Sequence, residues 1–198
     1  MANKNNKVKY NLKNTHYALL SIAEDGTVSY GTPTPMPGAV SISLDANGEP
    51  ENFYADGIAY YVINNNMGYD GDLELALIPE SFRTEILKEE LDDNGVLIEN
   101  AQVELASFAL LFEFSGDQKH IRHVLYNCAA SRPSIEGKTN EENREVQTET
   151  LSIKATPLSS GMVKAKTGNT TDATVYNDWY KAVYMPTITE TDESEEIA

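Results

Sequence analysis

The sequence has one cysteine and no long apolar run, and these absences set the first limits. With Cys128 as its only cysteine, the chain cannot form an internal disulfide. No apolar segment approaches the ~18 residues that a membrane helix needs, so we expect no membrane role. The N-terminal lysines are not followed by the apolar stretch of a secretory signal peptide. We therefore expect a soluble protein made in a reducing compartment.

Basic residues are also scarce. The 198 residues include 15 Lys and Arg against 31 Asp and Glu, which gives a formal net charge of −16. Proteins that bind nucleic acid do so largely by placing Lys and Arg against phosphates. A chain this acidic is expected to repel DNA rather than bind it.

Groups that commonly carry catalysis are few and poorly spaced. His120 and His123 lie three apart in a predicted strand, and this odd separation places them on opposite faces, where they cannot share a metal. His16 is isolated. Cys128 ends an apolar strand and is interpreted as a buried structural thiol rather than a nucleophile.

Known catalytic and ligand-binding motifs are missing as well. The segment 70–74, DGDLE, lacks the glycine position and the terminal glutamate of a calcium loop. The sequence contains no phosphate-binding glycine loop, nucleophile elbow or zinc pattern. We expect no catalytic residues, no cofactor and no metal, and hence not an enzyme. A carboxylate pair of the glycosidase type remains an open alternative because acids are abundant.

The strongest pattern that is present is alternation with a period of two, which is typical of strands with one buried face. It predicts inward-facing residues Val40, Ile42 and Leu44; Leu73, Leu75 and Leu77; Phe108, Leu110, Phe112 and Phe114; and Leu151 and Ile153. In the third set Glu113 is expected to face outward. Segment 58–63 is apolar on both faces and is expected to be buried on both. Residues 134–147 are polar and predicted to form a solvated loop.

Two helices are expected beside the strands. In segment 79–91 the residues Phe82, Ile86, Leu87 and Leu91 share one helical face, with Pro79 in the first turn. Segment 172–184 begins with Asp172 as a candidate N-cap and places Val175, Trp179 and Val183 at a spacing of four. The chain is thus expected to form one mainly β domain over 1–198, with a main flanking helix and a short C-terminal helix.

The segment 53–71 is unusually rich in tyrosine and asparagine. Tyrosine suits interfaces because its ring buries apolar area while its hydroxyl stays hydrogen-bonded. The segment exceeds a tight hairpin and has no basic residue. We predict an extended arm that docks on a neighbouring molecule, with its tip at 64–68. Its assembly residues are predicted to be Phe53, Tyr54, Tyr60, Tyr61, Asn64, Asn65, Asn66 and Tyr69.

The two ends differ in charge from the rest of the chain. Residues 1–20 contain lysines and no acid, whereas residues 190–198 contain acids and no base. Neither end has apolar periodicity, so we expect a flexible basic N-terminal arm over about 1–9 and an acidic C-terminal tail over about 187–198.

The sequence resembles the major tail proteins, also called tail tube proteins, of long-tailed non-contractile phages (siphophages). The resembling segments lie within roughly residues 8–186, and the longest are FYADGIAYYVINNNMGYDGDLELALIPESFR and FALLFEFSGDQKHIRHVLYNCAASRPSIEGKT. The resemblance implies a β-sandwich or partial barrel flanked by a helix. It also implies that six copies form a ring and that rings stack into a tube for ejection of genomic DNA.

That resemblance further implies partners and a location. The partners would be other copies of the chain, a tail tip or initiator complex, a tape measure protein and a tail terminator protein. Double-stranded DNA would pass through the tube without specific binding. The protein would be assembled in the cytoplasm of a bacterial host and end in the virion tail.

The residues alone leave other functions open. The first is a monomeric β-sandwich binding module for carbohydrate or a cell surface, which would carry a concave aromatic patch. The second is a hydrolase that uses a carboxylate pair.

Overall fold

The computed structural model describes residues 5–139 and 144–187, and in these residues the chain is mainly β. The strands are β1 (Lys9–Ile22), β2 (Val28–Tyr30), β3 (Thr34–Pro35), β4 (Ala39–Asn47), β5 (Glu51–Ala55), β6 (Ile58–Ile63), β7 (Gly68–Leu75), β8 (Glu90–Leu91), β9 (Leu97–Ile98), β10 (Phe108–Gly116), β11 (Ile121–Ala130), β12 (Glu149–Ala155) and β13 (Lys164–Lys166). The helices in this part of the chain are α1 (Glu80–Glu85) and α2 (Ala173–Asp178).

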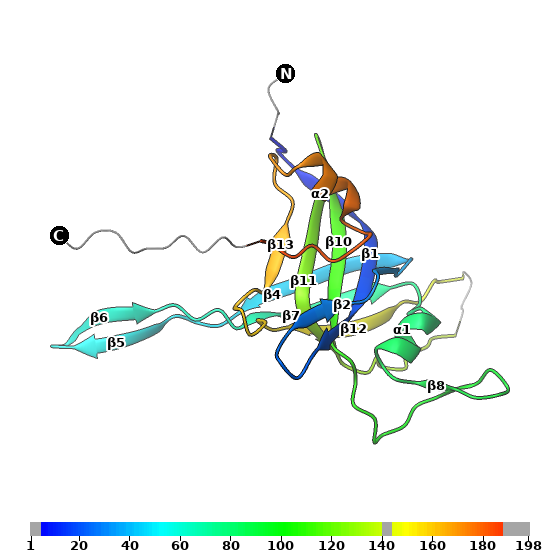
Figure 1. The fold of residues 1–198 in the computed structure, drawn as a ribbon. Helices are drawn as coiled ribbons and strands as arrows, with labels where there is room; N and C mark the ends of the chain where they lie inside the picture. The colour runs from blue at the N-terminus through cyan, green and yellow to red at the C-terminus, as the bar shows by residue number, and fades with distance from the viewer. Residues whose placement is uncertain (1–4, 140–143, 188–198) are drawn as a thin grey trace.

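Nine of the strands form one antiparallel sheet that folds over on itself. Its order is β2-β1-β10-β11-β12-β7-β4, with β3 on β1 and β13 on β11. The long strand β11 changes partner along its length, since residues 123–125 pair with β13 and residues 128–130 pair with β12. In Figure 1 the half containing β10 and β11 therefore crosses the half containing β4 and β7.

The main core lies between the two halves of this sheet. Phe108 and Leu110 of β10 meet Leu73 and Leu151 of β7 and β12, and all four side chains are fully buried. A second core covers the other face of β10 and β11, where Trp179 and residues 183 and 184 pack on Leu111, Val124 and Tyr126. The strands β10 and β11 are thus buried on both faces, which makes them the centre of the molecule.

Both helices are shorter than the sequence pattern predicts. Helix α1 ends after Glu85 and Lys88 has a positive φ of 59°, so the chain turns away before Leu91, which is exposed in β8. Its buried face is as expected, since the Phe82 ring lies edge-on to Tyr17 and Phe108 at centroid distances of 5.1 and 5.3 Å. Each of the two helices has six residues.

The start of α2 is correctly predicted by local sequence. The Asp172 carboxylate accepts hydrogen bonds from the backbone N–H groups of Thr174 and Val175, as an N-cap does. Those bonds, led by the one from Thr174, hold the pKa of this carboxyl below its usual range.

The predicted inward faces are mostly confirmed, with two corrections. Val40 is exposed because a register irregularity between Ala39 and Ser41 breaks the alternation at the start of β4. Leu77 is also exposed, since β7 ends at Leu75 and the chain leaves the sheet before α1.

Asn6, which lies within the expected flexible arm over about 1–9, is fastened to the body, while residues 1–4 of that arm lie outside the described residues. The Asn6 amide accepts hydrogen bonds from the backbone N–H groups of Gln118 and Lys119 and donates one to the Lys119 carbonyl. A side-chain amide offers both donor and acceptor, so it can satisfy both kinds of group in this turn. The predicted acidic tail lies outside the described residues, except for residue 187.

Candidate self-assembly surface

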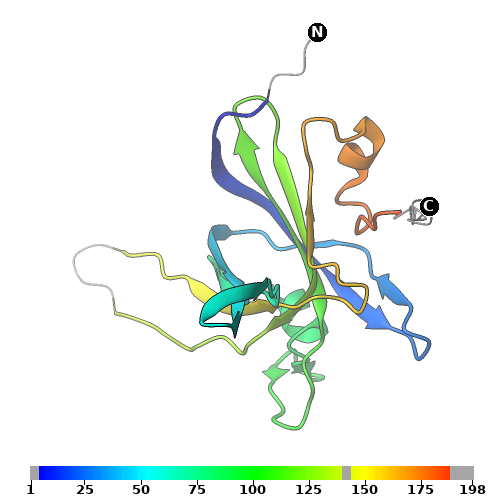
Figure 2. The same ribbon diagram turned by 90° about the vertical axis from the view of Figure 1, so that its left-hand side faces the viewer.

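The strands β5 and β6 form a hairpin that projects away from the rest of the molecule, and we call it the arm (residues 48–67). It continues the paired strands β4 and β7, and β5 and β6 pair only with each other in the part of the chain that the structure describes. Figure 1 shows the arm at the left, and Figure 2 looks onto its end. At ~3.3 Å per residue, the chain extends roughly 30 Å from Asn47 to the turn.

The arm exposes nearly all of its apolar side chains. Tyr60 is 70% exposed, Tyr54 66% and Tyr61 64%. Ile58, Val62, Ile63 and Met67 are exposed as well, which corrects the expectation that segment 58–63 is buried on both faces. A strand that is apolar on both faces has the same sequence pattern whether it is buried in the core of its own chain or exposed for contact with another molecule. An exposed apolar patch of this kind marks a contact site in a folded protein.

A tight turn shapes the end of the arm. Asp56 and Gly57 both have positive φ, at 51° and 78°, as the two central residues of a type I′ hairpin turn require. Phe53 pairs with Tyr61 across the two strands, and Tyr54 pairs with Ala59, so a register shift lies between these pairs. The true tip is therefore Asp56-Gly57, and the predicted tip at 64–68 lies instead at the base.

The base of the arm is held tightly in the sheet. The Met67 N–H donates to the Asn47 carbonyl at 2.9 Å, and the Asn66 side chain accepts from the Gly68 N–H at 3.1 Å. Gly68 has a φ of 102°, and a Cβ on it would lie 1.8 Å from the Ala155 carbonyl oxygen. This close approach permits only glycine where the arm leaves β7.

The predicted assembly residues therefore separate into three groups. Phe53, Tyr54, Tyr60 and Tyr61 lie on the arm and are exposed. The exposed Asn64, Asn65 and Asn66 form the second half of the base. Tyr69 lies in β7 and packs against the main core, where its hydroxyl receives a hydrogen bond from Lys164. Tyr69 is thus part of the body and not of the arm.

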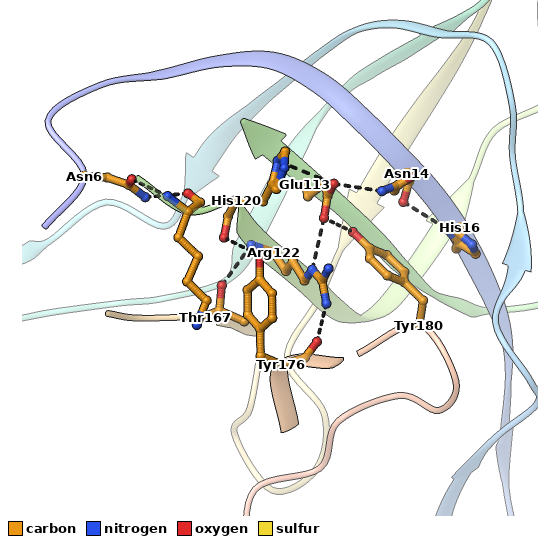
Figure 3. A network of polar contacts seen from close by, with 10 residues as sticks. Asn6, Asn14, His16, Glu113, His120, Arg122, Thr167, Tyr176 and Tyr180 are labelled. Carbon is orange, nitrogen blue, oxygen red and sulfur yellow. Dashed lines mark hydrogen bonds and ion pairs between the residues drawn. The ribbon is translucent and has the colours of Figure 1, made fainter. Parts of the chain in front are cut away.

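A buried charged cluster fastens the C-terminal segment to the sheet (Figure 3). Glu113 was expected to face solvent, but it is 2% exposed because residues from α2 to Tyr184 cover this face. Its carboxylate accepts hydrogen bonds from Arg122 at 3.0 Å, Asn14 at 2.7 Å and the Tyr180 hydroxyl at 3.3 Å. The Arg122 guanidinium lies 3.9 Å from the centre of the Tyr176 ring. The cluster satisfies a buried charge and holds Tyr176 and Tyr180 in place.

The histidines and the cysteine form no site together. His120 lies near Glu113, whereas His123 stacks on Phe112 at 5.1 Å on the opposite face, as the spacing predicts. Burial, with a smaller effect from Lys166, Lys9 and Lys164, lowers the pKa of His123 to about 4. Burial raises the pKa of the Cys128 thiol to about 12, so the thiolate that a nucleophile needs is strongly disfavoured.

A hollow of about 550 Å³ lies between α1, the 132–136 segment and the outer face of β12. Its carboxylates are engaged in structural contacts. Arg83 binds Glu89 at 3.1 Å and Glu149 at 2.9 Å, and Glu149 also accepts from the Ile78 N–H at 2.6 Å. Arg132 pairs with Glu99 at 2.9 Å. The hollow has no aromatic lining, so it lacks the concave aromatic patch of a sugar-binding module.

Within residues 5–139 and 144–187, no cluster of metal-ligating side chains is found and no helix is long and apolar enough to cross a membrane. The chain matches no protein-family model, and a search of curated proteins finds no significant relative.

Proposed function

We propose that this protein is a structural subunit that assembles through its arm into stacked rings forming a phage tail tube. The observation that carries the proposal is the arm, a projecting hairpin whose aromatic side chains are not covered by any of the residues that the structure describes. An isolated two-stranded hairpin is marginally stable in water, so docking on a neighbour would stabilise it. A contact between two different surfaces that repeats from copy to copy builds rings or filaments.

The outer face of β4, β7 and β12 suits the wall of a channel for DNA. It carries Asp70, Asp72 and Glu74 among serine and threonine hydroxyls. Glu74 accepts hydrogen bonds from Thr148 at 2.6 Å and Ser41 at 2.8 Å, and these bonds hold its pKa below the usual range. The carboxylate therefore stays ionised at neutral pH and repels phosphate, which lets DNA pass without sticking.

The experiment is to remove the arm and leave the body intact. Because Asn47 pairs with Gly68, residues 48–67 can be replaced by an Asn-Gly turn that closes the β4–β7 ladder directly. We expect the unmodified chain, concentrated with or without a tail-tip complex, to form rings and tubes in negative-stain electron microscopy. The armless variant should stay a folded monomer or isolated ring.

The matched control removes exposed apolar side chains elsewhere. Ile135 and Val146 are more exposed than the arm residues but lie outside the arm, so Ile135→Ser with Val146→Ser should leave assembly unchanged. Tubes formed by the armless variant would contradict the proposal, as would an unmodified chain that stays monomeric even with the tail-tip complex.

A further inference from the structure

A second surface on the body is complementary to the arm. An apolar groove of about 340 Å³ opens between β4 on one side and β10 and β11 on the other. Its wall includes Ile42, Leu44, Phe112 and Phe114, and lysines Lys9 and Lys164 stand at its rim. We call it the lysine groove. Its volume falls within the ~300–1,000 Å³ of pockets that hold ligands, so an aromatic side chain fits it.

The two lysines of the groove have no carboxylate partner in the described part of the chain. The Lys9 ammonium lies 4.6 Å from the centre of the Phe114 ring, and that of Lys164 lies 4.2 Å from the centre of the Tyr69 ring. Neither takes part in an ion pair, and no Asp or Glu lines the groove. The groove thus presents uncompensated positive charge beside open apolar surface.

The arm has the opposite character on the same kind of surface. Residues 48–67 contain Glu49, Glu51 and Asp56 and no basic residue, and these acids form no ion pair among the described residues. Glu51 stands on the same strand as Phe53, two positions away, so the two side chains point to the same face. One face of the arm therefore offers an aromatic ring and a carboxylate together.

On these observations, and resting on the assembly role proposed above, we propose that the arm of one copy docks in the lysine groove of a second copy. Its aromatic side chains cover the groove wall, and Glu49 and Glu51 approach Lys9 and Lys164. The chain's own arm points away from its body, so the groove receives the arm of another molecule. Complementary charge of this kind fixes the register of a contact and excludes wrong partners.

The hollow between α1 and β12 suits the arm less well. It is lined by Asp72, Glu89, Glu99, Glu136 and Glu149, and its arginines already pair with three of these acids. An acidic arm would meet like charge there.

The first test is disulfide capture between two full-length chains. One chain carries Tyr61→Cys on the arm and the other Leu44→Cys in the groove, and the two are mixed under mild oxidation. We expect a crosslinked heterodimer on a non-reducing gel. A chain that carries Ser152→Cys, with its cysteine in the hollow between α1 and β12, is the control and should not crosslink. Capture at position 152 with none at position 44 would overturn the groove assignment.

The second test is charge reversal with rescue. Lys9→Glu with Lys164→Glu should raise the concentration needed for assembly by about tenfold or more, as measured by sedimentation velocity. Adding Glu49→Lys and Glu51→Lys to the same chain should restore assembly. Lys138→Glu with Arg144→Glu makes the same charge change at two exposed positions outside the groove and should have no effect. Thermal melting verifies that each variant is folded.

The outcomes separate this inference from the proposed function. If the groove variants assemble as the unmodified chain does while the armless variant fails, the groove is wrong and the arm's role stands. If the chain with reversed charges in both the groove and the arm does not regain assembly, the groove assignment is also overturned. If the armless variant assembles normally, both proposals are wrong.

Discussion

Two antiparallel hairpins of the molecule, β10–β11 and β5–β6, are both rich in apolar residues but differ in what surrounds them. The β10–β11 hairpin is covered on both faces, whereas the β5–β6 hairpin of the arm is covered on neither. Both contain aromatic residues and both are well paired along their strands. The difference shows that strand formation is a local matter, while burial depends on which other elements reach the strand.

The comparison predicts that truncating a phenylalanine to alanine destabilises the fold strongly in the core hairpin and hardly at all in the arm. Phe108→Ala removes a fully buried ring from the core hairpin and should lower the free energy of unfolding by about 3–5 kcal/mol. Phe53→Ala on the arm should change it by less than about 0.5 kcal/mol at concentrations where the chain is monomeric. Urea denaturation followed by tryptophan fluorescence measures both. An equal loss for the two variants would mean that the arm is part of the folded core.

A pH titration sharpens the comparison at the buried end of the core hairpin. The pKa of His123 is lowered to about 4, so the unfolded chain binds a proton there at higher pH than the folded chain does. The contribution of the neutral His123 to the free energy of unfolding is therefore fully present above pH ~6.5. It is lost as pH falls toward 4, by at most about 3 kcal/mol.

Carboxyl groups also titrate in this pH range. The effect of His123 is therefore measured as the difference between the unmodified chain and a variant that lacks the imidazole. Urea unfolding of the unmodified chain and of His123→Gln is compared at several pH values from 7 to 4. We expect the unmodified chain to lose more stability over this window than the variant loses. Parallel pH profiles would show that His123 takes up its proton equally well in the folded state.

Two glycines test where the arm joins the body. Gly57 at the tip and Gly68 at the base both have positive φ, but a Cβ at Gly57 has nothing within 4 Å, whereas one at Gly68 meets the Ala155 carbonyl. Gly68→Ala should cost more than about 2 kcal/mol of global stability because β7 must shift against β12. Gly57→Ala should leave the global value within about 0.5 kcal/mol and speed amide exchange in β5 and β6 only.

Much of the fold follows from local sequence. Alternation placed Leu73, Leu151 and Phe108 correctly, because a strand with one apolar face has few other ways to bury it. Asp172 was identified as an N-cap because capping depends only on residues two and three positions away. The lengths of the helices were not predictable in this way, since α1 stops where the backbone turns at Lys88 and not where its apolar pattern ends.

The candidate site was predicted in part. The aromatic content of segment 53–71 pointed to an arm, and four of its tyrosine and phenylalanine residues lie on one. Tyr69 was placed on the arm but lies in β7, because nothing in the sequence marks the point at which β6 ends and β7 enters the body. The Asp56-Gly57 dipeptide was the available signal for the true tip, since Asp-Gly favours a two-residue hairpin turn. The lysine groove had no sequence signal, as its walls come from strands far apart in the chain.

The sequence by itself determined the strands β4, β6, β7, β10, β11 and β12, the N-cap of α2, the acidic charge and the presence of an aromatic, base-free segment. All of these depend on residues within a few positions of one another. Only the tertiary structure decided that segment 58–63 is exposed, that Glu113 is buried against Arg122, and that Lys9 and Lys164 share one apolar groove. Burial and charge pairing depend on contacts between segments that are far apart in the sequence. The tertiary fold determines those contacts, and the local sequence pattern does not.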